Sequence, residues 1–216
     1  MILRPRPEIL VATHNPGKIC EIQGALRHLP VTLRYLDDFP NVAAVDEVGQ
    51  TYEQNAVLKA RSYSTQTGVY ALADDSGLEV DALAGMPGVF TARFGGTHAS
   101  DAERIKKLLA ALSEYPPKER SARFACSMAL AGYENDEETL ITTRPRLLKV
   151  TEGKCEGVIA NASRGTNGFG FDPVFMPYPF DKTFAELPDE VKARISHRAI
   201  ALHAMQVFLD RWLAQT

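Results

Sequence analysis

Cysteine is scarce in this sequence, and long apolar runs are missing. Three cysteines, Cys20, Cys126 and Cys155, are widely spaced among 216 residues without a CxxC pair, which argues against a disulfide framework and favours a reducing compartment. No segment approaches the roughly 20 apolar residues of a membrane helix, and the first residues lack the apolar run of a signal peptide. We therefore expect a soluble cytoplasmic protein with structural thiols and no membrane partner.

The sequence also lacks a surplus of positive charge. Lys and Arg number 24 and Asp and Glu number 27, which gives a formal net charge of -3. Domains that hold nucleic acid polymers usually carry a basic surplus, so this balance argues against such a partner. The histidines form no HExxH or similar array, and no zinc site is assigned.

The patterns that are present predict a single domain, 1–216, of mixed α/β class. With 45% hydrophobic residues, the chain can bury one core, or one core with an appended lobe. Apolar runs and alternation predict strands over 8–13, 69–73 and 122–130. Capping residues followed by helical spacing predict helices that open at Asn15, Thr51 and Ser100, and another over 196–213.

Three further expectations concern the ends and faces of these elements. The strand 69–73 should end at Asp74 and Asp75, which would place two carboxylates at the strand edge where ligands bind in open α/β sheets. A hairpin could join 122–130 to 139–143, and the charged segment 134–149 looks inserted. The side chains expected to face the core from the last helix are Ile200, Ala204, Val207, Phe208 and Trp212.

The stretch after the first strand combines features that suit a bound phosphate. Asn15 is a favoured N-cap, Pro16 suits the first helical position, and Lys18 follows at the positive end of the helix. Free backbone N–H groups and the lysine could together bind an anion. The stretch is not a Walker A loop, because Ala12 and Ile19 stand where that motif needs Gly and Ser or Thr. An ordinary capped helix with a solvated lysine is the alternative.

Two pairs of acidic residues are candidate metal ligands. Asp74 and Asp75 bring two carboxylates together, which is costly unless a cation or a raised pKa absorbs the repulsion. Mg²⁺ prefers carboxylate oxygens and bridges to phosphates, so one aspartate could hold the metal while the other orients water. Asp46 and Glu47 could supply further oxygens, and Lys59 could meet a triphosphate. An acidic turn and ordinary surface charge are the alternatives.

A glycine-rich loop with two aromatic rings is a candidate base-binding segment. Residues 167–173 read NGFGFDP, in which the glycines allow close approach and the phenylalanine rings can stack on a flat base. Asp172 could accept a hydrogen bond from the base edge. A tight turn with two core phenylalanines is the alternative, and the third glycine of a dinucleotide fingerprint is missing. Further donors for base or phosphate oxygens are Lys192, His197 and Arg198.

In their order along the chain, these motifs resemble one family, the inosine triphosphate pyrophosphatases, which act on ITP, XTP and their deoxy forms. The resemblance implies Mg²⁺-dependent hydrolysis to the monophosphate and pyrophosphate, and a homodimer. It also implies a mixed, partly antiparallel twisted sheet flanked by helices, with two lobes and a central nucleotide cleft. The matching stretches are LVATHNPGK at 10–18, TYEQNAVLKA at 51–60, ADDSGLEVDALAGMPGVFTARF at 73–94, GFGFDPVF at 168–175 and ISHRAIAL at 195–202.

The resemblance also assigns roles to residues. Asp75 matches the proton acceptor, and Lys59 matches a lysine expected near the phosphates. Asp46 falls on the Mg²⁺ position, where the family usually has glutamate, so whether Asp46 or Glu47 reaches the metal stays open. His14 stands where relatives often have glycine. Positions that match substrate-binding residues are Thr13, His14, Asn15, Pro16, Gly17, Lys18, Ser76, Phe169, Gly170, Phe171, Asp172, Lys192, His197 and Arg198.

The mechanism expected from these residues is charge neutralisation of the triphosphate while Asp75 directs water at the α-phosphorus. Donors from His197 and Arg198 would favour a 6-oxo purine over adenine. One rival is a Maf-like pyrophosphatase that acts on pyrimidine or modified nucleotides, and another is a nucleotide-binding regulator without catalysis. A phosphatase with an aspartyl nucleophile fits less well. Its DxD motif needs Asp two residues after Asp74 or Asp75, and Ser76 and Gly77 occupy those positions.

Overall fold

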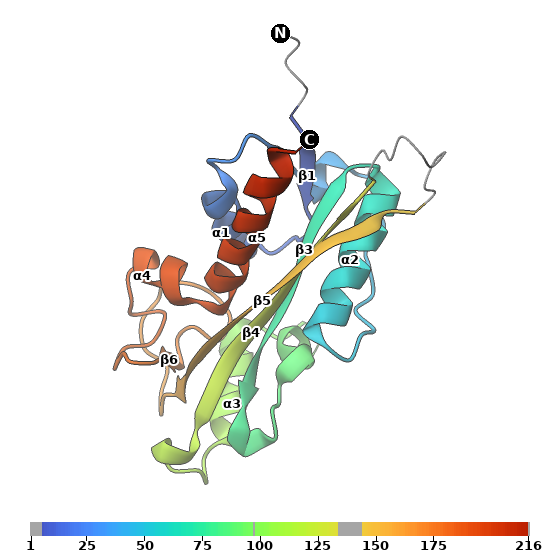
Figure 1. Ribbon diagram of the computed structural model, residues 1–216. Coiled ribbons are helices and arrows are strands. Elements are labelled where there is room, and N and C mark those ends of the chain that lie inside the picture. Colours follow the sequence, from blue (N-terminus) through green and yellow to red (C-terminus); the bar gives the residue numbers. More distant parts are fainter. Residues whose placement is uncertain (1–5, 97, 134–143, 216) are drawn as a thin grey trace. The chain divides into compact units, whose positions relative to one another are not determined.

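The computed structural model describes residues 6–96, 98–133 and 144–215, and the chain divides into two compact units (Figure 1). Unit 1 comprises Met1–Asp75, Ser127–Glu152 and Ala201–Thr216, and unit 2 comprises Ser76–Cys126 and Gly153–Ile200. Each unit is assembled from separated segments. The boundary between Asp75 and Ser76 therefore divides the predicted site residues into two groups.

The described residues confirm a mixed α/β fold. The six strands follow the order β2-β1-β3-β4-β5-β6, in which β1 pairs parallel with β2 and β3, whereas β5 and β6 pair antiparallel. The strands are β1 (Glu8–Val11), β2 (Thr32–Tyr35), β3 (Tyr70–Val80), β4 (Ser121–Gly132), β5 (Arg146–Ile159) and β6 (Phe175–Pro177). The helices are α1 (Pro16–Leu26), α2 (Tyr52–Thr67), α3 (Asp101–Ala111), α4 (Asp189–Ile195) and α5 (His197–Leu213).

Local sequence signals set the ends of the helices in unit 1. The Asn15 side chain caps α1 by accepting from the Lys18 N–H, and Pro16 occupies the first helical position, as predicted. Thr51 caps α2, and Gly68 ends it with a positive φ of 74°. Figure 1 shows α2 on one side of the strands and α1 with α5 on the other. A hydrogen bond from Gln206 to the Ala25 carbonyl joins those two helices.

The core of unit 1 is built from small and aliphatic side chains. Leu10 of β1, Ala71 and Ala73 of β3 and Ala56 and Ala60 of α2 share one buried cluster. Alanines on the packed face let α2 approach the strands closely. Asn55 and Lys59 of α2, which lie beside Asp75 of β3, are therefore held on a rigid element.

Strand β3 corrects one prediction. It was expected to end at Asp74 and Asp75, but it continues to Val80, so both carboxylates lie inside the strand. They are only 2% and 5% exposed. A buried carboxylate persists in a strand only where partners compensate its charge, and those partners come from distant helices.

The segment after β4 also differs from expectation. Residues 146–149, which looked like part of an insertion, are the first residues of β5. Along β5 from Thr151 to Gly157, buried and exposed residues alternate, which is the period of a strand with one face on a core. The predicted hairpin partner 139–143 lies outside the described residues.

Unit 2 packs a largely aromatic and aliphatic core. Phe124 of β4, Phe175 of β6 and Phe184 lie together, with ring centroids 4.7 Å apart for Phe124 and Phe175 and 5.4 Å for Phe175 and Phe184. Helix α3 adds Ile105, Leu108 and Leu112 to this core. The predicted capping box of Ser100 and Glu103 opens that helix.

The buried face of α5 is offset from the predicted one. Ile200 and Val207 are 41% and 40% exposed, so they do not face the core. Trp212 is buried as predicted, and its ring meets Tyr70 edge-on at 4.8 Å. The side chains that the helix buries in unit 1 are Ala201, Leu202, Met205, Leu209 and Trp212.

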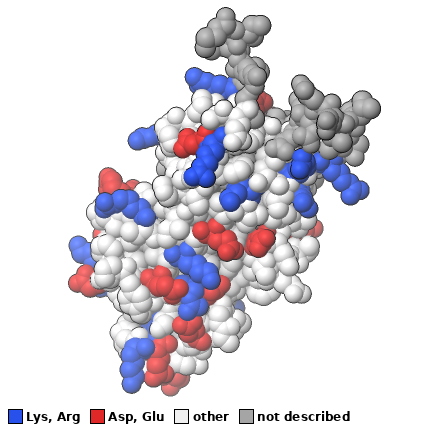
Figure 2. Space-filling view, viewed as in Figure 1, with Lys and Arg blue, Asp and Glu red and all other residues white. Residues whose placement is uncertain are grey.

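No membrane-spanning helix is found in the described part of the chain. None of its helices combines the length and apolar character that crossing a bilayer requires. On the face drawn in Figure 2, acidic and basic side chains are interspersed.

The three thiols differ in exposure, and this difference predicts their reactivity. Cys20 is exposed, whereas Cys126 and Cys155 are buried. Burial, with a smaller effect of the Glu156 charge, raises the pKa of Cys155 to about 12. Because the thiolate is the nucleophile, iodoacetamide near neutral pH should label Cys20 alone in the folded protein and all three thiols in denaturant. Peptide mass spectrometry would read the labelling, and rapid modification of Cys155 in the native protein would contradict the described burial.

Candidate active site

In unit 1, three carboxylates and two lysines form a charged cluster, which we define as Lys18, Glu47, Lys59, Asp74 and Asp75. The Lys18 Nζ lies 2.9 Å from Asp74 Oδ2, and the Lys59 Nζ lies 2.5 Å from Glu47 Oε1 and 3.8 Å from Asp75 Oδ1. The carboxylates thus outnumber the ammonium groups by one. The cluster brings together candidate site residues from α1, α2, β3 and the segment before α2.

The two adjacent aspartates of β3 have different partners because successive side chains of a strand point to opposite faces. Asp74 pairs with Lys18 at the start of α1, whereas Asp75 accepts a hydrogen bond from Asn55 of α2 at 2.9 Å. Lys59 interacts electrostatically with both aspartates, because the charges of Asp74 and Asp75 each raise the pKa of Lys59.

Burial and charge shift the acid–base properties of the cluster. Burial raises the pKa of Asp75, and the Glu47 charge adds to the increase, while Lys59, Asn55 and Lys18 oppose it. Burial alone would lower the pKa of Lys59, but the charges of Asp74, Asp75 and Glu47 together raise it. Lys59 therefore stays protonated, and Asp75 becomes a stronger base than an exposed aspartate.

The predicted phosphate turn, 13–18, forms a capped helix start in which residues 14–16 are exposed and the others are half-buried. Three of its amides are already bonded, since the Thr13 N–H donates to the Val11 carbonyl, the Asn15 N–H to Thr13 Oγ1 and the Lys18 N–H to Asn15 Oδ1. The predicted free N–H groups are therefore fewer than the sequence suggested. What the turn offers an anion is the positive helix end and the Lys18 ammonium, which sits beside Asp74.

The four candidate metal ligands are not equivalent. Glu47 joins the charged cluster through Lys59, whereas Asp46 is exposed. Among the described residues, no group of three or more His, Cys, Asp or Glu side chains is arranged as a ready metal site. The assignment of Asp46, Glu47, Asp74 and Asp75 to a metal stays a prediction.

Asn55 was not identified as a site residue from the sequence, although its side chain donates a hydrogen bond to Asp75 of the cluster. It is 0% exposed, and its amide also accepts the Gly49 N–H at 2.7 Å. A signal was present in the sequence, because Asn55 precedes Lys59 by four residues and so shares its face of α2.

In unit 2, the glycine-rich loop folds around the carboxylate of Asp172. Asp172 Oδ2 accepts the Phe169 N–H at 2.9 Å and the Lys192 ammonium at 2.6 Å. Gly168 has a φ of 75°, and a Cβ there would lie 2.0 Å from Asp172 Oδ2, so the loop requires glycine at this position. Asp172 therefore shapes the loop, and its role as an acceptor for the base edge stays a prediction.

The two phenylalanines of the loop have separate roles. Phe171 is 2% exposed and belongs to the core of unit 2, so the expectation that both rings stack on a base is corrected. Phe169 is half-buried, and two cations lie near its ring. The Lys192 Nζ is 4.5 Å and the Arg198 Cζ is 5.7 Å from the ring centroid.

The donors predicted at the start of α5 lie in the same unit. Arg198 is 2% exposed and donates to Ser76 Oγ at 2.8 Å, which places two predicted substrate residues in contact. The His197 ring stacks on Phe124 with centroids 4.7 Å apart and an interplanar angle of 13°. Phe124 was not predicted as a site residue, and alternation alone marks it only as a core position of β4.

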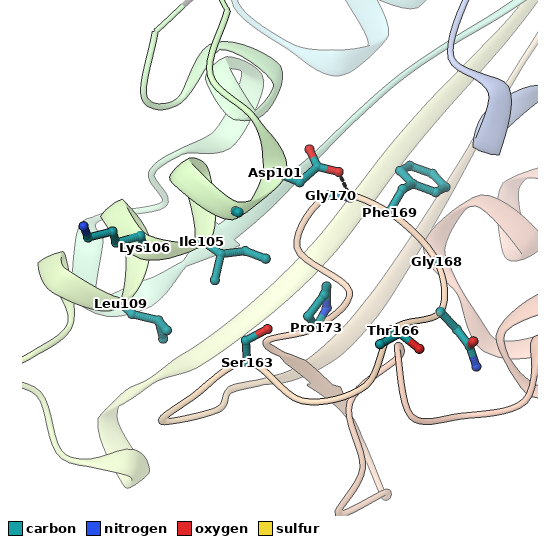
Figure 3. A pocket seen from close by; sticks show the side chains of 12 residues that line it. Asp101, Ile105, Lys106, Leu109, Ser163, Thr166, Gly168, Phe169, Gly170 and Pro173 are labelled. Atoms are coloured by element: carbon teal, nitrogen blue, oxygen red, sulfur yellow. Dashed lines mark hydrogen bonds between the residues drawn. The ribbon is translucent and has the colours of Figure 1, made fainter.

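A pocket of about 500 Å³ adjoins this loop (Figure 3). Ile105, Lys106 and Leu109 of α3 line one side, and the 163–173 segment lines the other. Asp101, the first residue of α3, accepts the Gly170 N–H at 2.7 Å and so ties the helix to the loop. Helix α3 therefore helps to hold the loop that carries Phe169, besides contributing to the core of unit 2.

Comparison with known proteins agrees with these features. The model of the Ham1 family matches residues 9–208. A dITP/XTP pyrophosphatase of Bacillus cereus is 42% identical over 205 residues, which cover 95% of this chain and 96% of the relative. A dITP/XTP pyrophosphatase of Syntrophobacter fumaroxidans is 46% identical over 208 residues, with 95% of this chain and 84% of the relative covered.

Solved structures agree as well. The fold is similar to that of a HAM1 protein from Coxiella burnetii, with a TM-score of 0.83 and 42% identity over 95% of this chain and 99% of the other. It is also similar to the Ham1 protein of Staphylococcus aureus, with a TM-score of 0.80 and 36% identity over 94% and 98% of the two chains.

Proposed function

This chain belongs to the Ham1 family, and we propose that it hydrolyses non-standard purine nucleoside triphosphates to the monophosphate and pyrophosphate. The substrates proposed are ITP, dITP and XTP, and the relatives named dITP/XTP pyrophosphatases support this choice. The observation that carries the proposal is the charged cluster of unit 1, in which buried Asp74 pairs with Lys18 and buried Asp75 lies 3.8 Å from Lys59. Removal of deaminated purines from the nucleotide pool would follow from this activity.

The residues of unit 1 suit the phosphate chemistry. The ammonium groups of Lys18 and Lys59 would offset phosphate charge, which increases at the leaving pyrophosphate as the bond breaks. Asp75 would accept a proton from the attacking water as the general base. Water oxygen bonds to the α-phosphorus, the bond from that phosphorus to the bridging oxygen breaks, and pyrophosphate leaves.

The carboxylates of the cluster fit Mg²⁺, which we propose as the cofactor. Carboxylate oxygens are the ligands this ion prefers, and an acidic excess in a buried cluster favours a cation. Glu47 and Asp75 both contact Lys59 and are the residues we propose to hold the metal, with Asp74 close by and Asp46 the remaining candidate. When bound, Mg²⁺ would supply neutralisation of the phosphate oxygens.

The residues of unit 2 suit a purine base. Phe169 offers a ring for stacking, and His197 and Arg198 offer hydrogen-bond donors. A 6-oxo purine presents an acceptor to such donors, whereas adenine presents a 6-amino group. A buried donor left unpaired by adenine would reject ATP by a large factor.

A panel of nucleotides tests the proposal. Purified protein would be incubated with Mg²⁺ and ITP, dITP, XTP, ATP, GTP, CTP or UTP, and the products would be separated by ion-exchange chromatography. We expect the oxo-purine substrates to give monophosphate and pyrophosphate much faster than ATP. Equal rates for ATP and ITP would contradict the specificity, and preference for a pyrimidine would favour the Maf-like alternative. Omission of Mg²⁺ should abolish turnover.

We further propose a cytoplasmic homodimer, on the strength of the family resemblance. Light scattering after size-exclusion chromatography should give the mass of two chains. The mass of one chain would refute the assembly without affecting the proposed reaction.

A further inference from the structure

The buried amide of Asn55 joins two separate parts of the charged cluster. Its Nδ2 donates to Asp75 Oδ2 at 2.9 Å, and its Oδ1 accepts the Gly49 N–H at 2.7 Å. The amide has one orientation here, because a flipped group would face its NH₂ toward the Gly49 N–H and its oxygen toward a carboxylate. At 0% exposure, water cannot substitute for either contact.

Gly49 lies against this amide so closely that the position of one fixes the position of the other. A Cβ on Gly49 would lie 2.6 Å from Asn55 Oδ1 and 2.8 Å from the Gln54 Cβ. Gly49 is two residues after Glu47. The Glu47 carboxylate pairs with Lys59, which lies one helical turn after Asn55 on α2. Asn55 and Lys59, on one face of α2, thus contact both Asp75 and the segment 47–49.

We infer that Asn55 is a positioning residue that fixes Asp75 and the Glu47 segment in one arrangement. The inference rests on the proposed function, in which Asp75 accepts the proton and Glu47 with Asp75 holds the metal. A single rigid amide sets the distance between these groups, so its loss would reduce the fraction of productive geometries. Misplacement by about 1 Å can lower a rate by roughly 10²-fold.

The variant Asn55→Asp removes the N–H that donates to Asp75 and places a carboxylate beside it. It keeps the shape and an oxygen for the Gly49 N–H, but it replaces the donor that faces Asp75 by an oxygen. We expect kcat for dITP to fall by roughly 10²-fold with KM changed by only a few-fold. A general loss of folded protein would instead appear as a lower melting temperature in circular dichroism.

A second variant keeps Asn55 and instead perturbs the contact between its side-chain oxygen and Gly49. In Gly49→Ala, the added methyl group must displace the Asn55 oxygen or the turn, so kcat should also fall. The matched control is Gln54→Ala, because the Gln54 Oε1 accepts the neighbouring Gln50 N–H at 2.8 Å and anchors the same segment from the exposed side. Its kcat should stay within about two-fold of the wild-type value.

The outcomes separate the inference from the function. Wild-type kcat in folded Asn55→Asp or folded Gly49→Ala would overturn the inference, as would an equally large loss in Gln54→Ala. If the wild-type protein released no pyrophosphate from any oxo-purine triphosphate, the proposed function would fail first, and the inference would fall with it.

Discussion

Replacement of Asp75 by Asn should lower kcat for dITP by roughly 10²- to 10⁴-fold, the contribution typical of a positioned general base. The amide is nearly isosteric with the carboxylate but cannot accept the proton of the attacking water. It also removes one of the charges that hold Lys59, whose Nζ lies 3.8 Å from Asp75 Oδ1. Steady-state release of pyrophosphate measures the effect.

The control for this substitution is an aspartate outside the cluster. Asp81 pairs with Arg123 on the surface of unit 2, at 2.8 Å, and Asp81→Asn should retain wild-type kcat. Because Asp75→Asn removes a buried charge, its melting temperature should be equal to or above that of the wild type. Unchanged turnover in a folded Asp75→Asn protein would remove Asp75 from the mechanism.

Replacement of Lys192 by Met should destabilise the protein by about 3–5 kcal/mol, because it leaves the buried Asp172 carboxylate without its cation. The Lys192 Nζ lies 2.6 Å from Asp172 Oδ2, and the two side chains are 10% and 4% exposed. The same lysine approaches the Phe169 ring, so the loop that carries the proposed stacking face would also lose order. Urea denaturation gives the free energy of unfolding.

Two further variants test the cause of this loss. Adding Asp172→Asn to Lys192→Met should restore a large part of the lost stability, since no buried charge is then left unpaired. Lys107 also lies over an aromatic ring, 4.9 Å from the centroid of Phe94, but on the exposed side of α3. Lys107→Met should cost less than about 1 kcal/mol. Equal losses for the two lysines would show that ring contact, and not the ion pair, governs stability.

Local capping signals were the most predictable part of the fold. Asn15 with Pro16, Thr51 with Gly68, and Ser100 with Glu103 each act within a few residues, and all three helices begin where these residues indicate. Such signals depend on contacts that lie close in the sequence, so a single chain shows them directly.

The course of β3 could not be read in the same way. Adjacent aspartates are typical of a strand end or a turn, and the sequence gives no sign that burial continues past them. The strand continues because Asp74 meets Lys18 and Asp75 meets Asn55, both on helices remote in the sequence. Which helix faces an acidic position is a property of tertiary packing, so the partners appear only in the structure.

The face of α5 was missed for a different reason. The helix reads HRAIALHAMQVFLDRWL, in which apolar residues lie on most sides and several stripes fit a helical period. Burial selects Ala201, Met205 and Leu209, a stripe rotated by one residue from Ile200, Ala204 and Phe208. Periodicity identifies a helix of this kind but not its orientation.

The roles within the glycine-rich loop were likewise only partly predictable. Its glycines and carboxylate marked 167–173 as a ligand loop or a tight turn; the structure shows a tight turn around Asp172, and the ligand role stays a prediction. Phe171 fills the core while Phe169 stays half-buried beside two cations. The separation depends on the positive φ angles of Gly168 and Gly170, which aim successive side chains in different directions.

The most direct test of the proposed reaction is hydrolysis of dITP in ¹⁸O-labelled water with Mg²⁺ present, followed by mass spectrometry of the products. Attack of water on the α-phosphorus predicts equal amounts of dIMP and pyrophosphate, with the label in dIMP alone. Release of orthophosphate and dIDP, or label in the pyrophosphate, would contradict the account.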